Sequence, residues 1–460
     1  MERQNAWKTY TKKQLKELEE LNKGYIDFLS EGKTERLCTK LAIEKAEAAG
    51  YRDIEKLIGK KKRLKAGDKV YATWMNKTIA LFQIGKKPLE QGMNILGAHI
   101  DSPRIDVKQN PLYEDSDLVY LDTHYYGGIK KWQWVTIPLA IHGVVVKKSG
   151  KTVEIHIGDD PKDPVFCISD LLIHLSSELQ EKKASKVVEG ENLDLIVGNI
   201  PLAKEEKDAA KKGVLAILKK EYDIEEEDFM SAELEIVPAG PARECGFDRS
   251  IIMSYGQDDR VCAYTSLVAM LEVEAPEVTS CCLLVDKEEI GSVGATGMQG
   301  RFFENTVAEL LNLCDQYSDL ALRRCLANSS MLSSDVNAGF DPMYASAFEK
   351  RSASFLGRGL VFNKFTGRGG KSGSNDANAE YVARLRKIMD DSKVNYQFAE
   401  LGKVDQGGGG TIAYIMALYG MEVIDSGVAV LNMHAPYELT SKADVYEAKK
   451  GYVAFLNSVK

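Results

Sequence analysis

The chain has 460 residues, of which 44% are apolar and 28% charged, as is ordinary for a globular protein with a large core and room for two domains. Its formal net charge of −8 argues against a nucleic-acid or anionic-membrane partner, because both surfaces repel an acidic protein. No apolar run approaches the ~20 residues that cross a bilayer, and the first residues lack the apolar core of a secretion signal. With eight cysteines and no Cys-x-x-Cys motif, we expect a cytoplasmic protein.

The first hundred residues predict helices followed by strands. Residues 11–60 place apolar side chains at helical spacing, which predicts amphipathic helices, and residues 69–84 predict a hairpin. An apolar run then leads into the sequence Gly-Ala-His-Ile-Asp-Ser-Pro-Arg at 97–104, so we expect a buried strand that ends at His99. His99 and Asp101 point the same way because side chains alternate along a strand. A metal could bind one ring nitrogen while a neighbouring carboxylate fixes the other, although a polar strand end alone would explain the pattern.

The pattern changes between residues 107 and 250. Short strand-like runs follow one another at 118–121, 135–141, 144–146, 153–157 and 234–238, separated by turn residues, and a charged helical tract covers 204–228. We expect 107–250 to be an inserted β-rich domain, which leaves 1–106 and 251–460 as the main domain.

From residue 251 onward, strands alternate with helices. Helices are predicted at 302–313, 318–327 and 442–456, a further helix has Asp376 as its expected N-cap, and a Gly-rich stretch at 407–410 precedes a helix at 411–418. This alternation predicts an α/β fold with a largely parallel sheet covered on both faces.

Metal-capable side chains follow five of the predicted strands. If these strands share one parallel sheet, their carboxyl ends bring the side chains together. Two histidines with three carboxylates form a ligand set that zinc, manganese or cobalt accepts, and one shared carboxylate would allow two ions. Glu288 points away from its neighbour Glu289 and could act as general base and acid. The five candidate ligands are His99, Asp258, Glu289, Asp335 and His434.

These motifs, in this order and at these spacings, resemble the aspartyl aminopeptidase and vacuolar aminopeptidase-I family of two-zinc metalloaminopeptidases. The resemblance covers nearly the whole chain, including the β-rich insertion. It implies the two-zinc exopeptidase fold, a mainly parallel mixed sheet flanked by helices, with an inserted oligomerisation domain. The motifs that carry it are Gly97–Pro103, Asp258–Arg260, Asp286–Ser292, Ser333–Ala338 and Leu431–Ala435.

The resemblance also implies an activity, which is metal-dependent removal of the N-terminal residue from peptides. It assigns His99 and Asp335 to one divalent ion and Glu289 and His434 to a second, with Asp258 between the two ions. Asp101 would then orient His99, and Glu288 would be the general base. The ions would most simply be zinc, with manganese or cobalt as alternatives. A cis bond between Asp258 and Asp259 and a tetrahedral homododecamer are further implications.

Some positions depart from the family pattern. Residues 132–136 read Trp-Gln-Trp-Val-Thr where the family usually has a Trp-Phe-Asp-Arg-like motif, and Asp170 replaces a histidine that shapes a neighbouring subunit's pocket in acid-preferring members. The preferred N-terminal residue therefore stays open. Lys364, Gly409 and Thr411 are candidate substrate contacts, because basic groups can pair with a substrate carboxylate and a Gly-rich loop permits close approach.

Two other functions compete with the aminopeptidase. A two-metal amidohydrolase or deacylase of the same architecture would use the same ligands, and aminoacyl substrates would distinguish it from N-acylated ones. A metal-dependent scaffold without activity is a different class, but all five candidate ligands and Glu288 are present.

Overall fold

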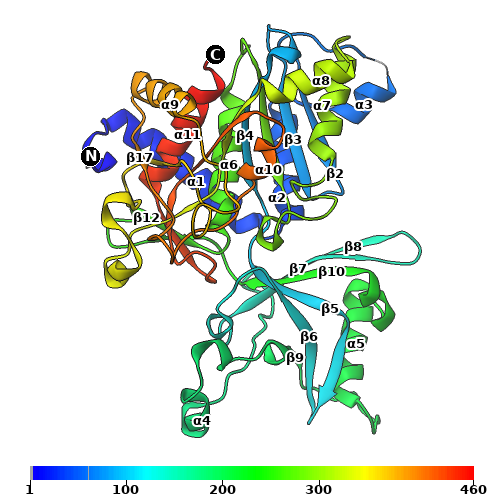
Figure 1. Ribbon diagram of the computed structural model, residues 1–460. Helices are drawn as coiled ribbons and strands as arrows, with labels where there is room; N and C mark the ends of the chain where they lie inside the picture. Colours follow the sequence, from blue (N-terminus) through cyan, green and yellow to red (C-terminus); the bar gives the residue numbers. More distant parts are fainter. Residues whose placement is uncertain (1–3, 61, 460) are drawn as a thin grey trace. The chain divides into compact units, whose positions relative to one another are not determined.

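The computed structural model describes residues 4–60 and 62–459 (Figure 1). The chain forms two compact units, and the first comprises residues up to Asp101, Ala242–Met433 and from Glu438 onward. The second comprises Ser102–Pro241 together with the short segment His434–Tyr437. For comparison, the insertion predicted from the sequence spans 107–250, whereas this second unit begins at Ser102, ends its main segment at Pro241 and includes His434–Tyr437. Among the described residues, none of the helices has the length and apolar character that a bilayer crossing requires.

A nine-stranded mixed sheet organises the first unit. Its four neighbouring strands β13, β4, β14 and β18 run parallel, and antiparallel pairs occur only toward its two sides. This is the mainly parallel α/β sheet predicted from the sequence. In spatial order the strands are β1 (Arg52–Asp53), β2 (Lys69–Trp74), β3 (Thr78–Gln83), β13 (Thr279–Val285), β4 (Met93–His99), β14 (Ser330–Ser333), β18 (Glu422–Gly427), β16 (Leu360–Asn363) and β17 (Tyr396–Phe398).

Helices cover both faces of this sheet. Alternate strand residues, such as Ile95 and Leu96 in β4, belong to two different buried clusters, as a sheet buried on both faces requires. One cluster contains side chains of α1 (Lys12–Glu31), α2 (Glu35–Ala48), α6 (Gln257–Glu272), α9 (Ala379–Asp391) and α11 (Lys442–Leu456). The other contains side chains of α3 (Ile54–Gly59), α7 (Phe302–Leu313), α8 (Asp319–Ala327) and α10 (Ala413–Ala417).

Most predicted helices are present, but the start predicted for α9 is wrong. The helix begins at Ala379 with Asn378 as its N-cap. Asp376 lies before the helix, where its carboxylate accepts a hydrogen bond from the Lys371 ammonium at 2.9 Å. Asp376 pairs with Lys371 in the loop before the helix and does not cap it, and sequence pattern does not reveal such an ion pair.

A five-stranded sheet also belongs to the first unit. It is mostly antiparallel and contains β11 (Arg243–Cys245), β12 (Ile251–Ser254), β20 (Glu438–Ser441), β19 (Ala429–Leu431) and β15 (Asn337–Ala338). This sheet matters for the site because β12 leads directly into the Asp258 motif.

The second unit is built on a six-stranded antiparallel sheet, so the insertion is β-rich as predicted. Its order is β8 (Thr152–Ile157), β7 (Leu139–Val146), β10 (Ala232–Pro238), β5 (Arg104–Asp115), β6 (Leu118–Tyr126) and β9 (Leu195–Gly198). The unit also contains α4 (Ser177–Gln180) and α5 (Ala209–Tyr222). The predicted strands at 135–141 and 144–146 are a single strand, β7, which continues through Gly143. A Cβ there would lie 1.9 Å from the Glu233 carbonyl oxygen, so the glycine permits close strand approach.

Candidate metal centre

Three of the candidate ligands follow adjacent parallel strands of the large sheet. His99 ends β4, Glu289 comes four residues after β13, and Asp335 comes two residues after β14. Strand β4 lies between β13 and β14 and runs parallel to both. Their carboxyl ends therefore meet at one edge of the sheet, which is the place where open α/β sheets carry their sites.

Asp258 also lies beside His99, but it follows a strand of a different sheet from the one predicted. It follows β12 of the small, mostly antiparallel sheet, at the start of α6. Its backbone amide donates to Glu438 Oε2 at 3.0 Å, which ties this turn to β20. The peptide bond between Asp258 and Asp259 is cis, as the family resemblance implied. The expectation that Asp258 follows a strand of the parallel sheet was wrong, because strand pairing cannot be read from an apolar run alone.

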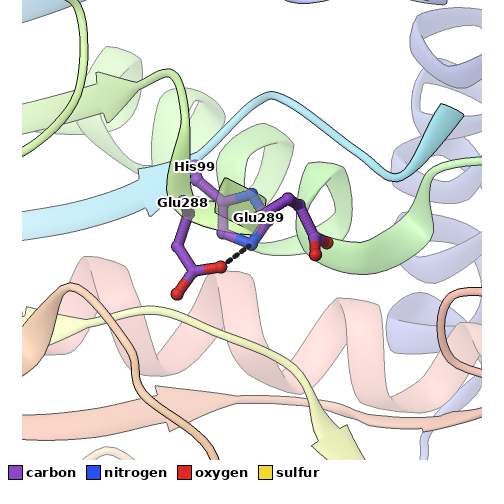
Figure 2. Close-up of side chains that lie close together, drawn as sticks. All are labelled: His99, Glu288 and Glu289. Carbon is purple, nitrogen blue, oxygen red and sulfur yellow. Dashed lines mark ion pairs between the residues drawn. The ribbon is translucent and has the colours of Figure 1, made fainter. Parts of the chain in front are cut away.

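His99 is buried at the centre of the cluster. Its Nδ1 lies 3.0 Å from the backbone carbonyl oxygen of Asp101 and 3.3 Å from Asp101 Oδ1. If Nδ1 carries the proton toward these acceptors, Nε2 presents a lone pair. Nε2 lies 3.3 Å from Asp258 Oδ1 and 4.0 Å from Glu288 Oε2. The ring is thus oriented with Nε2 toward the carboxylates, as Figure 2 shows for Glu288.

Within the described residues of the first unit, two groups of ligand atoms lie close enough to hold an ion. One atom from each of His99, Asp258 and Asp335 lies within 4.8 Å of the others, and the same is true of His99, Glu288 and Glu289. Nitrogen and oxygen donors at these separations suit zinc and similar divalent cations.

The electrostatics of the cluster also fit a bound cation. Burial and the negative charges of Asp259, Asp258 and Glu288 raise the pKa of Asp335 well above its ordinary value. Burial lowers the pKa of His99, but the Asp101 and Asp258 carboxylates outweigh it and leave that pKa well above the ordinary value. Carboxylates crowded in this way repel one another, and a divalent cation would offset the repulsion. The donor set and its charge therefore match a metal centre.

His434 belongs to the second unit. It lies in the segment His434–Tyr437, and its Nδ1 is 2.9 Å from the backbone carbonyl oxygen of Gly128. A ring that donates from Nδ1 has its lone pair on Nε2, which is the arrangement of a metal-binding histidine. Its role as a ligand stays a prediction.

The three candidate substrate contacts lie in different places. Lys364 lines a cavity of about 1270 Å³ together with Phe340, Phe355 and Arg386, and none of the five candidate ligands lines this cavity. Thr411 donates from Oγ1 to Asp425 Oδ1 at 2.6 Å, and Gly409 donates from its backbone amide to Thr366. Their contacts with substrate stay predictions.

Asp259 and Asp425 are two further buried carboxylates that interact with the candidate residues and were not given a role from the sequence. Asp259 is fully buried, and its Oδ2 accepts from the backbone amide of His99 at 3.4 Å, so it helps to position the first candidate ligand. Asp425 in β18 is also buried, and both burial and the charge of Glu288 raise its pKa, to about 7. A charge inside the apolar run at 422–431 was the signal for Asp425.

An α/β sheet that gathers a histidine and several carboxylates at the carboxyl ends of its parallel strands is the framework of a metal-dependent hydrolase. Comparison with known proteins identifies the class further. The profile of the family described as "Aminopeptidase I zinc metalloprotease (M18)" matches residues 28–456. A curated probable M18 family aminopeptidase 1 of Clostridium acetobutylicum is 62% identical over 99% of this chain and 98% of its own length.

Solved structures agree with this assignment. A crystal structure of an M18 aminopeptidase from Thermotoga maritima covers 100% of both chains with 46% identity and a TM-score of 0.95. A yeast mApe1 dodecamer covers 94% of this chain and 95% of that chain with a TM-score of 0.75, and at 20% identity it shows the fold alone. The chain belongs to the M18 family of zinc metalloproteases and is a metal-dependent aminopeptidase, not the amidohydrolase or deacylase considered as an alternative.

Proposed function

We propose that this chain removes N-terminal residues from peptides with two divalent metal ions, most simply zinc, and with Glu288 as general base. Membership of a zinc metalloprotease family supports zinc, while manganese and cobalt accept the same nitrogen and oxygen ligands. The observation that carries the proposal is the convergence of His99, Asp258 and Asp335 ligand atoms within 4.8 Å, with Glu288 and Glu289 around the same histidine.

Each ligand has a proposed place. His99 and Asp335 would hold one ion and Glu289 and His434 the other, with Asp258 between them. The orientation of His99 supports this, because its Nε2 faces Asp258 Oδ1 at 3.3 Å. The hydrogen-bond partner of His434 Nδ1 likewise leaves Nε2 as the coordinating nitrogen.

The ions would polarise the scissile carbonyl and make water acidic enough to attack near neutral pH. Glu288 supplies the proton transfers. It adjoins the ligand Glu289, its side chain is 15% exposed, and its Oε2 lies 4.0 Å from His99 Nε2. From that position it takes a proton from the attacking water and passes it to the leaving amine.

The test is the substitution Glu288→Gln, which keeps the shape of the side chain but removes its basicity. We expect kcat to fall by about 10²–10⁴-fold, the range for loss of a general base, with the zinc content unchanged. Glu274→Gln, at an exposed position, is the matched control and is expected to match the wild type. Near-normal kcat in Glu288→Gln would contradict the base assignment, and loss of zinc would make Glu288 a ligand instead.

We also propose that the chain self-associates, as a tetrahedral homododecamer, through the predicted insertion 107–250. The dodecamer in the name of the yeast structure supports this assembly. Apolar side chains exposed on the second unit also support it, because such groups on a folded surface mark interaction sites, with Leu172 54%, Ile173 67% and Leu175 65% exposed. Sedimentation velocity of the wild type against Ile173→Asp with Leu175→Asp tests the proposal, and identical oligomers would contradict it.

We also propose that the enzyme is cytoplasmic and that its substrates are peptides. None of the eight cysteines forms a disulfide, which suits a reducing compartment.

A further inference from the structure

Two histidines face each other across neighbouring strands of the second unit. His142 on β7 and His156 on β8 are direct partners in the antiparallel register. Their Nδ1 atoms lie 3.2 Å apart, and the ring planes make an angle of 54°. His142 is buried, while the His156 side chain is 40% exposed at the edge strand of the sheet. One histidine of the pair, His142, is therefore enclosed by the protein, and the other, His156, is accessible to solvent.

The other nitrogen of each ring faces a carboxylate. His142 Nε2 lies 2.7 Å from Asp159 Oδ2, and His156 Nε2 lies 3.4 Å from Glu154 Oε2. A carboxylate beside Nε2 favours the proton on that nitrogen, which leaves the lone pair on Nδ1. With the proton on Nε2 in both rings, both Nδ1 lone pairs face the space between the rings; with the proton on one Nδ1, the 3.2 Å contact is a hydrogen bond between the rings. Two acceptors at 3.2 Å repel unless a cation, either a proton or a metal ion, lies between them.

The geometry also fits a metal ion. Zinc binds histidine nitrogen at about 2.0–2.1 Å with tetrahedral angles, so two such ligands lie about 3.3–3.4 Å apart. The observed 3.2 Å is close to this separation. Metal-bound histidines characteristically donate their second nitrogen to a carboxylate. Glu154 is hydrogen-bonded to His156 Nε2, and Asp159 Oδ2 lies 2.7 Å from His142 Nε2 without hydrogen-bond alignment.

The surrounding charge supports a cation as well. Besides Asp159 and Glu154, the residue opposite His142 on β10 is Glu235, whose Oε2 pairs with Arg104 Nε at 3.2 Å. Both histidines thus lie among carboxylates, and the exposed side of His156 lets water fill the remaining positions of an ion.

We propose that His142 and His156 bind a divalent transition-metal ion, zinc or copper by ligand type, in addition to any ions at the candidate metal centre. The site would use the two Nδ1 atoms and water, and it would join the edge strand β8 to β7. It shares no residue with the five candidate ligands, so it does not depend on the proposed catalytic mechanism.

Metal stoichiometry tests the proposal. Full-length protein is incubated with Zn²⁺, freed of unbound ion, and its zinc per subunit is measured by mass spectrometry for the wild type, His156→Ala and His124→Ala. His124 is an exposed histidine on β6 of the same sheet and serves as the matched control. We expect His156→Ala to hold one ion fewer than the wild type and His124→Ala to hold the same number. Equal zinc in all three proteins across the titration would overturn the proposal.

A second measurement needs no variant. Diethylpyrocarbonate acylates accessible histidine nitrogens, and peptide mass spectrometry reports the extent at each histidine. We expect added Zn²⁺ to protect His156 and leave the modification of His124 unchanged. Unchanged modification of His156 would mean that the pair shares only a proton, and the metal site would be rejected.

Discussion

The carboxylate of Asp101 holds the backbone of Glu288 in place. Its Oδ1 accepts from the amide of Glu288 at 3.1 Å, and its Oδ2 accepts from the amide of Glu289 at 3.2 Å. The same residue is in contact with the His99 ring, with Nδ1 3.3 Å from Oδ1. One buried side chain therefore connects the strand β4 to the turn after β13, and it positions a candidate ligand and the candidate base together.

This double contact predicts the effect of Asp101→Asn. An asparagine has one acceptor oxygen, so its NH₂ group would face a backbone N–H and the turn would have to move. We expect kcat/KM and zinc affinity to fall by about 10–100-fold, the usual cost of losing a group that orients ligands. Steady-state kinetics and zinc competition with a chelator measure both quantities. The exposed turn residue Asp117, changed to asparagine, is the control, and equal losses in both variants would contradict a specific role for Asp101.

The backbone position of the candidate ligand Asp335 depends on Gly427 in β18 having no side chain. A Cβ at this position of β18 would lie 2.0 Å from the backbone carbonyl oxygen of Asp335 and 3.1 Å from Cys262 Sγ. Gly427→Ala must therefore displace the backbone of a candidate ligand. We expect a loss of about 1–3 kcal/mol in the free energy of unfolding, typical of overpacking, together with weaker zinc binding.

Gly59→Ala is the matched control, because a Cβ there meets nothing within 4 Å. Urea unfolding of the zinc-free proteins and zinc titration separate the two effects. If Gly427→Ala bound zinc like the wild type, the position of Asp335 would not matter for the ion.

Asp170 leads to a prediction about the preferred N-terminal residue. The resemblance described in the sequence analysis places Asp170 where acid-preferring members would have a histidine that shapes a neighbouring subunit's pocket. An aspartate there would repel an acidic side chain by about 1 kcal/mol at an exposed site, or roughly fivefold in kcat/KM. We expect leucyl and methionyl substrates to be cleaved faster than aspartyl and glutamyl ones. Asp170→His should narrow this difference in a panel assay, and a wild-type preference for acidic residues would refute the argument.

The sequence pointed to the candidate residues themselves better than to the strands and contacts that position them. His99 and Glu289 followed from strand ends that periodicity reveals, and the parallel order β13–β4–β14 brings them together. The pairing of β12, the strand before Asp258, with β20 was not predictable, because the two strands are far apart in the sequence and leave no local pattern. The contact between Asp101 and the backbone of Glu289 was equally hidden, since a backbone amide has no signature in the sequence.

Asp425 predicts a change of stability with pH. The side chain is buried, Thr411 donates to its Oδ1 at 2.6 Å, and within the described part of the chain its Oδ2 has no hydrogen-bond partner. Burial, with a smaller contribution from the charge of Glu288, raises its pKa to about 7, against about 4 in an unfolded chain. Because the folded-state pKa is the higher one, the folded protein binds the proton more tightly.

The stability contributed by this proton is therefore fully present below about pH 4 and is lost as the pH rises through about 7. Asp425→Asn is neutral at every pH and keeps an acceptor for Thr411. As the pH rises from 5 to 8, the wild type loses this contribution and the variant does not. We therefore expect the free energy of unfolding of the variant, relative to the wild type, to increase by about a few kcal/mol over this range. Urea unfolding of chelator-treated protein across this range measures the difference. Parallel pH profiles for the two proteins would show that Asp425 is already ionised in the folded state, and the buried carboxyl would then need a positive partner.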